Sequence, residues 1–263
     1  MLLFLLIFSS YFGTTNEALP VHMYEVVSAN GEITVFADNI NYRDYTIEVN
    51  WNIKGLRNEV DQKLFVIPRN SSKIKVTKLR PVSNSYSYGY HYICYPGNLI
   101  TAKHDENAVY IVPFLKGTKS QVMQGYYEVF SHRGVCALDF KADVGTPVCA
   151  SREGLVVEVK KDSKKGCSSS SCSDHGNFIK ILHSDGTEGL YLHLAFGGVL
   201  VKEGEFVKAG VHIGYSGATG WVTGPHLHFE VVQPDNKGGK SVPTKFIIDG
   251  QPKYLIKKDI LVR

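Results

Sequence analysis

The sequence lacks the features that mark several large functional classes. No run of Lys and Arg is long enough for a nucleic-acid-binding arm, although the formal net charge is +4. No apolar run after the N-terminal block approaches the roughly 20 residues of a membrane span. The five cysteines show no zinc-finger spacing, and the chain has no convincing internal repeat. These absences argue against a nucleic-acid-binding protein, an integral membrane protein and a zinc-finger protein.

The composition is that of a soluble globular protein. The chain has 263 residues, of which 43% are hydrophobic and 21% are charged, enough for one large or two ordinary domains. A short apolar block at residues 2–8 is followed by small and polar residues up to Ala18. This order resembles a secretory signal peptide. We therefore expect residues 1–18 to be a signal peptide and the protein to be exported, to the periplasm or to the extracellular cell wall.

The sequence of residues 19–113 predicts a series of short β-strands. Runs rich in β-branched residues occur at 33–36, 45–49, 63–67 and 74–76, with turn residues between them. This spacing predicts a small β-sandwich as an accessory domain over residues 19–113. Tyrosines alternate strictly from Tyr86 to Tyr92, which predicts one tyrosine-covered strand face, with a sugar-binding platform as the alternative.

A second β-rich domain is expected over residues 114–233. It contains strand patterns at 155–159, 178–183 and 190–194, and a loop rich in Ser, Lys and Cys at 161–174. Residues 234–263 are expected to form a C-terminal extension that packs back on one of the two domains. The whole chain is thus predicted to be all-β.

The cysteines permit two pairings. Cys167 and Cys172 bracket four serines and could close a small loop in an oxidising compartment. Cys136 and Cys149 would lie opposite each other if a hairpin turned at residues 142–143. Cys94 would be left over.

The sequence from Gly224 to Glu230 alternates polar and apolar residues and predicts a strand. Successive strand side chains point to opposite faces, so His226, His228 and Glu230 share one face. The two imidazoles would be about 6.6 Å apart along the strand, an awkward distance for two ligands of one ion. One can bind a metal while the other acts on the substrate. Glu230 would orient one of them or form an ordinary salt bridge.

Other candidate ligands lie near the ends of predicted strands in the same domain, namely His132, Asp139 and His193. Three ligands drawn from His and Asp, with one open position, are typical of a catalytic zinc site. Zinc would activate a water molecule, and a further imidazole would move protons. The residue pattern alone does not decide which histidines bind metal.

Residues from about 124 to 232 resemble the catalytic domain of the lysostaphin-type (LytM-like) zinc endopeptidases of bacterial cell walls. The resemblance implies an antiparallel β-sheet of the barrel-sandwich hybrid type. The matching motifs occur in order over some 110 residues: Ser131-His132-Arg133-Gly134, Leu138-Asp139-Phe140, Gly145-Thr146-Pro147-Val148, Tyr191-Leu192-His193-Leu194, residues 214–220, and residues 224–230.

The resemblance also implies roles for the candidate residues. His132, Asp139 and His228 would bind Zn²⁺, and His193 and His226 would act as general base and transition-state stabiliser. Some relatives use a tyrosine shortly before the first ligand to stabilise the oxyanion. The candidates for that role here are Tyr126 and Tyr127.

The implied function is an exported zinc endopeptidase that hydrolyses peptide bonds in peptidoglycan cross-bridges or stem peptides. Its partners would be peptidoglycan peptides and not nucleic acid. The alternative is a catalytically idle binding or regulatory protein that acts on cell-wall hydrolases. Such relatives have typically lost ligands, whereas this chain keeps every expected group.

The first motif departs from the usual family spacing. His132 and Asp139 are seven residues apart, an odd spacing that an uninterrupted strand cannot aim at one point. A bulge or small loop is therefore expected at residues 133–136, with Gly134 as its natural place. Asp143 is the competing carboxylate, but it falls on a predicted turn and would leave Asp139 without a role.

Overall fold

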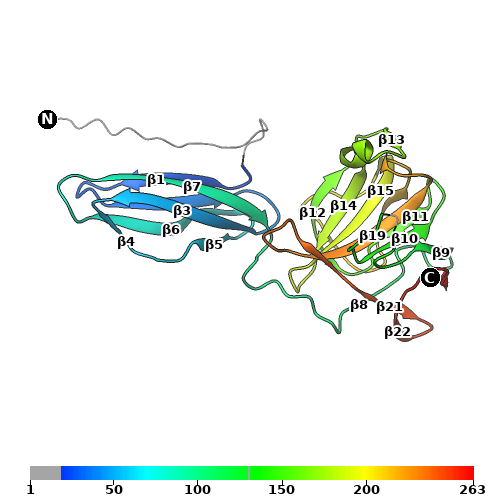
Figure 1. Ribbon diagram of the computed structural model, residues 1–263. Coiled ribbons are helices and arrows are strands. Elements are labelled where there is room, and N and C mark those ends of the chain that lie inside the picture. Colours follow the sequence, from blue (N-terminus) through cyan, green and yellow to red (C-terminus); the bar gives the residue numbers. More distant parts are fainter. Residues whose placement is uncertain (1–18, 130) are drawn as a thin grey trace. The chain divides into compact units, whose positions relative to one another are not determined.

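A computed structural model describes residues 19–129 and 131–263 of the protein. The expected signal peptide at residues 1–18 lies outside the described residues. The chain divides into two compact units between Ile100 and Thr101. Strands dominate both units, so the all-β prediction is confirmed (Figure 1). Within the described ranges, no helix is long and apolar enough to cross a membrane.

The first unit consists of two antiparallel sheets. One has the strand order β1-β2-β6-β4 and the other β5-β3-β7. Every second residue of β2 is buried, as expected for a strand with one face on a core. These buried residues share a hydrophobic core with Ile47 and Val49 of β3, so the two sheets enclose one core. The bounds are β1 His22–Val27, β2 Ile33–Asn39, β3 Tyr45–Lys54, β4 Leu56–Asn58, β5 Leu64–Ile67, β6 Ser71–Pro81 and β7 Ser87–Pro96.

Three of the four alternating tyrosines lie on β7, whereas Tyr86 precedes the strand. Tyr88, Tyr90 and Tyr92 are half-buried and pack against the core of the first unit. The Tyr92 hydroxyl donates a hydrogen bond to the Val21 carbonyl oxygen at 2.9 Å. This packing supports the structural interpretation of the tyrosine face.

The second unit is built around one large antiparallel sheet. Its main path runs β16-β12-β14-β15-β19-β10-β9-β23, with β11, β17 and β20 attached beside it (Figure 1). The bounds are β9 Lys119–Gln124, β10 Ala137–Lys141, β11 Pro147–Cys149, β12 Gly154–Lys160, β14 Asn177–Leu182, β15 Glu188–Val199, β16 Phe206–Val207, β17 His212–Ser216, β19 His226–Gln233, β20 Lys240–Val242 and β23 Ile260–Val262.

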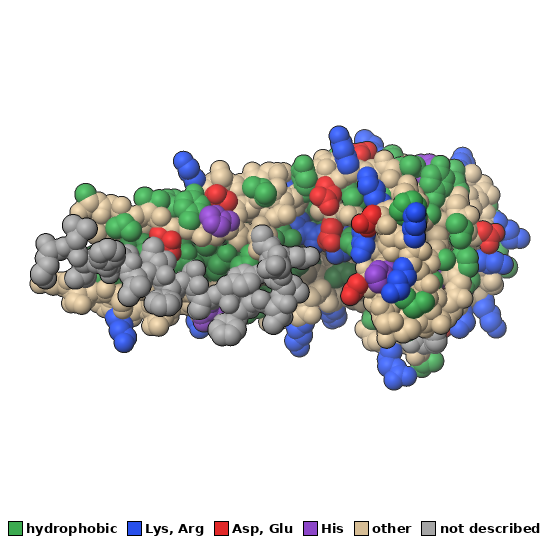
Figure 2. Space-filling model, turned by 90° about the horizontal axis from the view of Figure 1, so that it is seen from above, with side chains coloured by type: hydrophobic (Ala, Val, Ile, Leu, Met, Phe, Trp, Pro, Cys, Tyr) green, Lys and Arg blue, Asp and Glu red, His purple; other side chains and the backbone are tan. Residues whose placement is uncertain are grey.

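The core of this unit faces away from the motif histidines. Leu227 and Phe229 of β19 are buried together with Phe140 and Tyr191 from the neighbouring strands. Since strand side chains alternate, this packing directs the polar residues of β19 to the other face of the sheet. On the visible surface of the second unit, Lys and Arg side chains are spread out with Asp and Glu among them, without forming one basic patch (Figure 2).

Segments at both ends of the second unit join its core. Residues 101–113 include β8 (Val109–Tyr110), which pairs in parallel with β21 (Lys245–Ile248), and β21 pairs with β22 (Gln251–Tyr254). Tyr110 and Phe246 are fully buried in the same core. The C-terminal extension therefore packs back on the second unit.

The predicted hairpin between Cys136 and Cys149 is wrong. Strand β10 pairs with β9 and β19, whereas β11 pairs with β17, and both thiols are free and buried. The turn after β10 is held toward β17, because the Ser216 hydroxyl donates to the Asp143 carbonyl oxygen at 2.6 Å. In contrast, Cys167 and Cys172 do form a disulfide.

Candidate functional site

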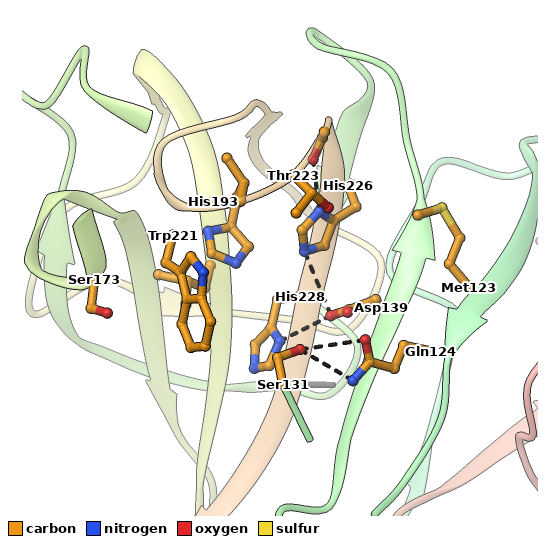
Figure 3. A pocket seen from close by; sticks show the side chains of 13 residues that line it. Met123, Gln124, Ser131, Asp139, Ser173, His193, Trp221, Thr223, His226 and His228 are labelled. Atoms are coloured by element: carbon orange, nitrogen blue, oxygen red, sulfur yellow. Dashed lines mark hydrogen bonds and ion pairs between the residues drawn. The ribbon is translucent and has the colours of Figure 1, made fainter. Parts of the chain in front are cut away.

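Three potential metal ligands converge around the middle of the pairing between strands β10 and β19. His132, Asp139 and His228 each offer one ligand atom, and these atoms lie within 4.8 Å of one another. Asp139 Oδ1 lies 3.2 Å from His132 Nε2. The same oxygen lies 3.0 Å from His228 Nδ1 (Figure 3). The His132 side chain is fully buried, and those of Asp139 and His228 are only 9% and 14% exposed.

The backbone explains how these residues meet. Asp139 and His228 are directly opposite each other in the antiparallel pairing of β10 with β19. His132 precedes β10 on a turn in which the Val135 amide donates to the His132 carbonyl oxygen at 2.9 Å. Gly134 lies in that turn with a φ of +76°, a conformation that glycine adopts without strain. The loop predicted from the odd spacing is confirmed, while Asp143 lies exposed on the following turn.

The hydrogen bonds of His132 fit a cation. Its Nδ1 lies 2.9 Å from the Gly125 carbonyl oxygen, which can only accept, so the proton is on Nδ1 and Nε2 has a free lone pair. That Nε2 is buried, makes no hydrogen bond and faces the Asp139 carboxylate. Two electron-rich atoms in this position repel each other unless a proton or a metal ion lies between them. Ligands of a tetrahedral zinc ion at 2.0–2.2 Å are about 3.3–3.6 Å apart. The separations of 3.2 Å and 3.0 Å between Asp139 Oδ1 and the two imidazole nitrogens are close to this range.

The electrostatics of the cluster favour a charged carboxylate. Burial by itself would raise the pKa of Asp139, but the facing imidazoles of His132 and His228 hold it well below its usual range. Burial would lower the pKa of His228, but the carboxylates of Asp139 and Glu230 outweigh it and raise the pKa to about 9. Glu230 Oε1 lies 3.9 Å from His228 Nε2, so this carboxylate does face the motif histidine.

His193 and His226 form a second pair beside the cluster. Their ring centroids are 4.7 Å apart. In each ring, Nδ1 contacts a carbonyl oxygen, that of Thr219 at 2.7 Å from His193 and that of Gly224 at 2.9 Å from His226. These contacts fix the proton on Nδ1 and leave Nε2 as the free atom. Burial, followed by the neighbouring imidazoles, lowers the pKa of His193 to about 3, which keeps this ring neutral.

A pocket of about 440 Å³ lies beside the metal-ligand cluster and the histidine pair. Asp139, His193, His226 and His228 all line it (Figure 3). His132 is fully buried and is not part of the lining. Several other residues line the pocket without a role predicted from the sequence, namely Met123, Gln124, Ser131, Ser173, Leu192, Trp221, Val222, Thr223 and Gly224. Ser131, Leu192 and Gly224 lie within the motifs at 131–134, 191–194 and 224–230. The others carry no local sequence signal, because they reach the pocket through long-range pairing.

The two candidate tyrosines lie outside this lining. The Tyr126 hydroxyl lies 3.0 Å from both oxygen atoms of Thr244, and burial raises its pKa to about 12. The Tyr127 side chain is 60% exposed, and its hydroxyl accepts a hydrogen bond from the Cys136 thiol.

Comparison with known proteins gives a consistent result. Residues 131–242 match the profile of Peptidase family M23. The chain is 39% identical over 104 residues to the peptidoglycan DD-endopeptidase ShyB of Vibrio cholerae, covering 40% of this chain and 21% of that protein. It is 35% identical over 134 residues to lysostaphin of Staphylococcus simulans, covering 50% and 24% respectively. The chain thus spans about a quarter or less of the length of these relatives.

A solved structure matches the same region. The catalytic domain of lysostaphin from Staphylococcus simulans is 33% identical, and the match covers 47% of this chain and 87% of that chain with a TM-score of 0.35.

Proposed function

We propose that the chain is a zinc-dependent endopeptidase that hydrolyses peptide bonds in bacterial peptidoglycan, because its residues 131–242 match the profile of Peptidase family M23. The substrate class is taken from the relatives, whose names include a peptidoglycan DD-endopeptidase and a glycyl-glycine endopeptidase. Because peptidoglycan lies outside the cytoplasm, the protein would act after export. The Cys167–Cys172 disulfide is in keeping with an oxidising compartment.

The unprotonated His132 Nε2 that faces the Asp139 carboxylate carries this proposal. His132 Nε2, His228 Nδ1 and the Asp139 carboxylate together form a set of two nitrogens and one oxygen, and Asp139 and His228 line the pocket. Such a set leaves the fourth tetrahedral position to water or substrate, as in catalytic zinc sites. When bound there, zinc supplies Lewis acidity toward a substrate carbonyl and lowers the pKa of water.

His193 and His226 would then handle protons and charge at their Nε2 atoms. His193 is kept neutral by its low pKa, so its Nε2 lone pair is available to accept a proton from water. His226 has its Nδ1 held by the Gly224 carbonyl oxygen, and its Nε2 lies 3.7 Å from Asp139 Oδ1. We assign His226, when Nε2 also carries a proton, to stabilising the developing negative charge. The proton that His193 accepts from water is the one that passes to the leaving amine.

The test is digestion of purified peptidoglycan, both directly cross-linked and glycine-bridged, followed by mass spectrometry of the products. We expect new amine termini that disappear with a chelator and return when zinc is added back. His228→Ala should abolish both the products and stoichiometric zinc, measured by elemental analysis. His91→Ala, at an exposed position of the first unit, is the matched control and should change neither.

Two results would contradict the proposal. If no chelator-sensitive amine termini form on either wall type, the chain is not a peptidoglycan endopeptidase. If zinc binds with His228 intact but no wall is cleaved, the idle binding protein becomes the better description.

A further inference from the structure

One wall of the pocket is built by two segments that are distant in sequence. The disulfide loop, residues 165–173, contains the strand β13 (Gly166–Cys167) and the start of the helical turn η1 (Ser170–His175). The indole segment, residues 219–224, contains the strand β18 (Gly220–Trp221). Ser173 from the loop and Trp221 from the segment both line the pocket (Figure 3).

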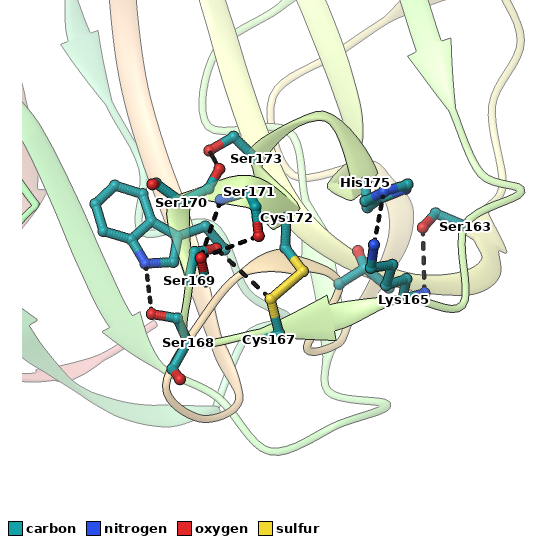
Figure 4. The surroundings of a disulfide bond; sticks show 12 residues. Ser163, Lys165, Cys167, Ser168, Ser169, Ser170, Ser171, Cys172, Ser173 and His175 are labelled. Carbon is teal, nitrogen blue, oxygen red and sulfur yellow. Dashed lines mark hydrogen bonds between the residues drawn. A yellow bond between two sulfur atoms is a disulfide. The ribbon is translucent and has the colours of Figure 1, made fainter.

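Backbone hydrogen bonds fasten the indole segment to the disulfide loop. Cys167 is directly opposite Trp221 in the parallel pairing of β13 with β18. The amides of Gly220 and Val222 donate to the carbonyl oxygens of Lys165 and Cys167, each at 2.9 Å. The Trp221 indole Nε1 donates to the Ser168 carbonyl oxygen at 3.1 Å, inside the loop that the Cys167–Cys172 disulfide closes (Figure 4).

Each segment also touches the backbone next to the other one, at Ala218 just before the indole segment and at Gly176 just after the disulfide loop. A Cβ added at Gly166 would lie 1.9 Å from the Ala218 carbonyl oxygen, and one at Gly220 would lie 2.7 Å from the Gly176 Cα. Neither approach leaves room for a side chain. The position of Trp221 is therefore set by the disulfide loop.

The side chains of this wall that face the pocket are mostly apolar. Trp221 is 36% exposed, and beside it are the half-buried Leu192 and the buried Val222. Near Asp139, the side chains of Gln124 and Ser131 form a polar pair joined by a hydrogen bond of 3.1 Å (Figure 3). The pocket thus presents an apolar surface at Trp221 as well as polar groups near Asp139.

We propose that Trp221 is a specificity-determining residue and that its wall is a subsite for a small apolar side chain, such as that of alanine, next to the scissile bond. The indole face covers the methyl group, and Leu192 and Val222 complete the contact. The disulfide acts as a positioning element that holds the indole through the Ser168 carbonyl oxygen. This inference rests on the proposed function, since it concerns the substrate of the same site.

The first experiment measures binding without hydrolysis. In a Trp51→Phe background, Trp221 is the only tryptophan and its fluorescence reports the wall. Chelator-treated protein is titrated with tetra-alanine and, as the matched ligand, tetraglycine. We expect tetra-alanine to shift the indole emission and to bind at least about threefold more tightly, since each buried methyl group favours binding by about that factor.

Three variants locate the effect. By calorimetry, Trp221→Ala should remove the preference for tetra-alanine, and Trp221→Phe should keep most of it. In the Trp51→Phe background, the double change Cys167→Ser with Cys172→Ser should make the Trp221 indole about twofold more accessible to acrylamide quenching. The change Cys94→Ser in the same background affects a free cysteine of the first unit and should leave the quenching unchanged.

An unchanged preference in Trp221→Ala overturns the subsite, and unchanged quenching in the double cysteine variant overturns the positioning role. If circular dichroism shows that the double variant is unfolded, the disulfide of the folded Trp51→Phe protein is reduced with dithiothreitol instead, and acrylamide quenching of Trp221 is measured before and after reduction. These outcomes differ from failure of the proposed function, because wall digestion can succeed while tetra-alanine shows no preference.

Discussion

Asp139 and His228 face each other across the pair of strands β10 and β19, with Oδ1 and Nδ1 3.0 Å apart. This register gives two of the three expected ligands without any contribution from a flexible loop. Rigid strands hold metal ligands more precisely than loops do. Zinc binding should therefore be sensitive to substitution of either Asp139 or His228.

Asp139→Asn should therefore weaken zinc binding more than about 100-fold, since even the loss of a group that only orients a ligand typically costs up to that factor. The measurement is competition with a chromophoric zinc chelator. Asp143→Asn is the matched control, because Asp143 lies four residues further along the chain on an exposed turn. Equal losses in both variants would place the ligand set elsewhere.

Gly220 should be intolerant of a side chain. Its φ is +84°, and an added Cβ would meet the Gly176 Cα at 2.7 Å. Gly145→Ala is the matched control, since Gly145 has a φ of +88° but open space around its Cβ position. We expect the control to lower the free energy of unfolding by about 1 kcal/mol, and Gly220→Ala by about 3 kcal/mol because of the added clash.

Urea unfolding followed by tryptophan fluorescence tests this difference. Gly220→Ala should also reduce peptidoglycan hydrolysis, because the adjacent Thr219 carbonyl oxygen holds His193 at 2.7 Å. If both glycine variants lose the same stability and keep full activity, the close approach at Gly220 is unimportant.

The buried ion pair between Arg152 and Asp185 should stabilise the second unit. Arg152 Nη1 lies 2.8 Å from Asp185 Oδ2, and the side chains are 14% and 9% exposed. Arg152→Met leaves the Asp185 carboxylate buried without its cation, so we expect a loss of about 3 kcal/mol in unfolding free energy.

The control is Lys253→Ala, which removes the partner of Asp259 from a side chain that is 52% exposed. An exposed pair contributes less than about 1 kcal/mol, so urea unfolding should separate the two variants clearly. Similar losses would mean that burial does not strengthen the Arg152 pair.

His183 should make the protein less stable in mild acid. Burial lowers the pKa of His183 to about 4, from an ordinary value of 6.5. Between these pH values the unfolded chain binds a proton at this residue and the folded protein does not. The free energy of unfolding therefore falls as the pH drops from 6.5 to 4, by about 3 kcal/mol in total.

Removal of the titrating ring tests this linkage. His183→Asn keeps an N–H donor for the Glu153 carbonyl oxygen, which contacts His183 Nδ1 at 2.8 Å. Urea unfolding across pH 4–7 should show a flatter profile than the parent, whereas His91→Asn, at an exposed position, should follow the parent. A profile in His183→Asn as steep as in the parent would assign the acid sensitivity to other groups.

Local patterns in the sequence were sufficient for much of the site. The alternation around His226 and His228 placed both rings on one face, because a buried Leu227 and Phe229 require it. The odd spacing from His132 to Asp139 required a loop, and Gly134 provides it. The disulfide between Cys167 and Cys172 followed from their short separation.

Long-range pairing could not be predicted in the same way. A strand pattern states which face is buried but not which strand lies beside it, so β10 was wrongly paired with β11. For the same reason Trp221 had no visible role, since its position depends on the pairing of β13 with β18, more than fifty residues apart. Tyr126 and Tyr127 were candidates by sequence position alone, and the direction of their side chains depends on contacts with Thr244 and Cys136.

The His228 ring lies between the carboxylates of Asp139 and Glu230, and this position gives the metal-free site an additional bound proton. With a pKa of about 9, this imidazole carries an extra proton at neutral pH. A metal ion that occupies Nδ1 must displace that proton into solution. The measured heat of zinc binding will then vary with the ionisation enthalpy of the buffer, by an amount that corresponds to about one proton per ion.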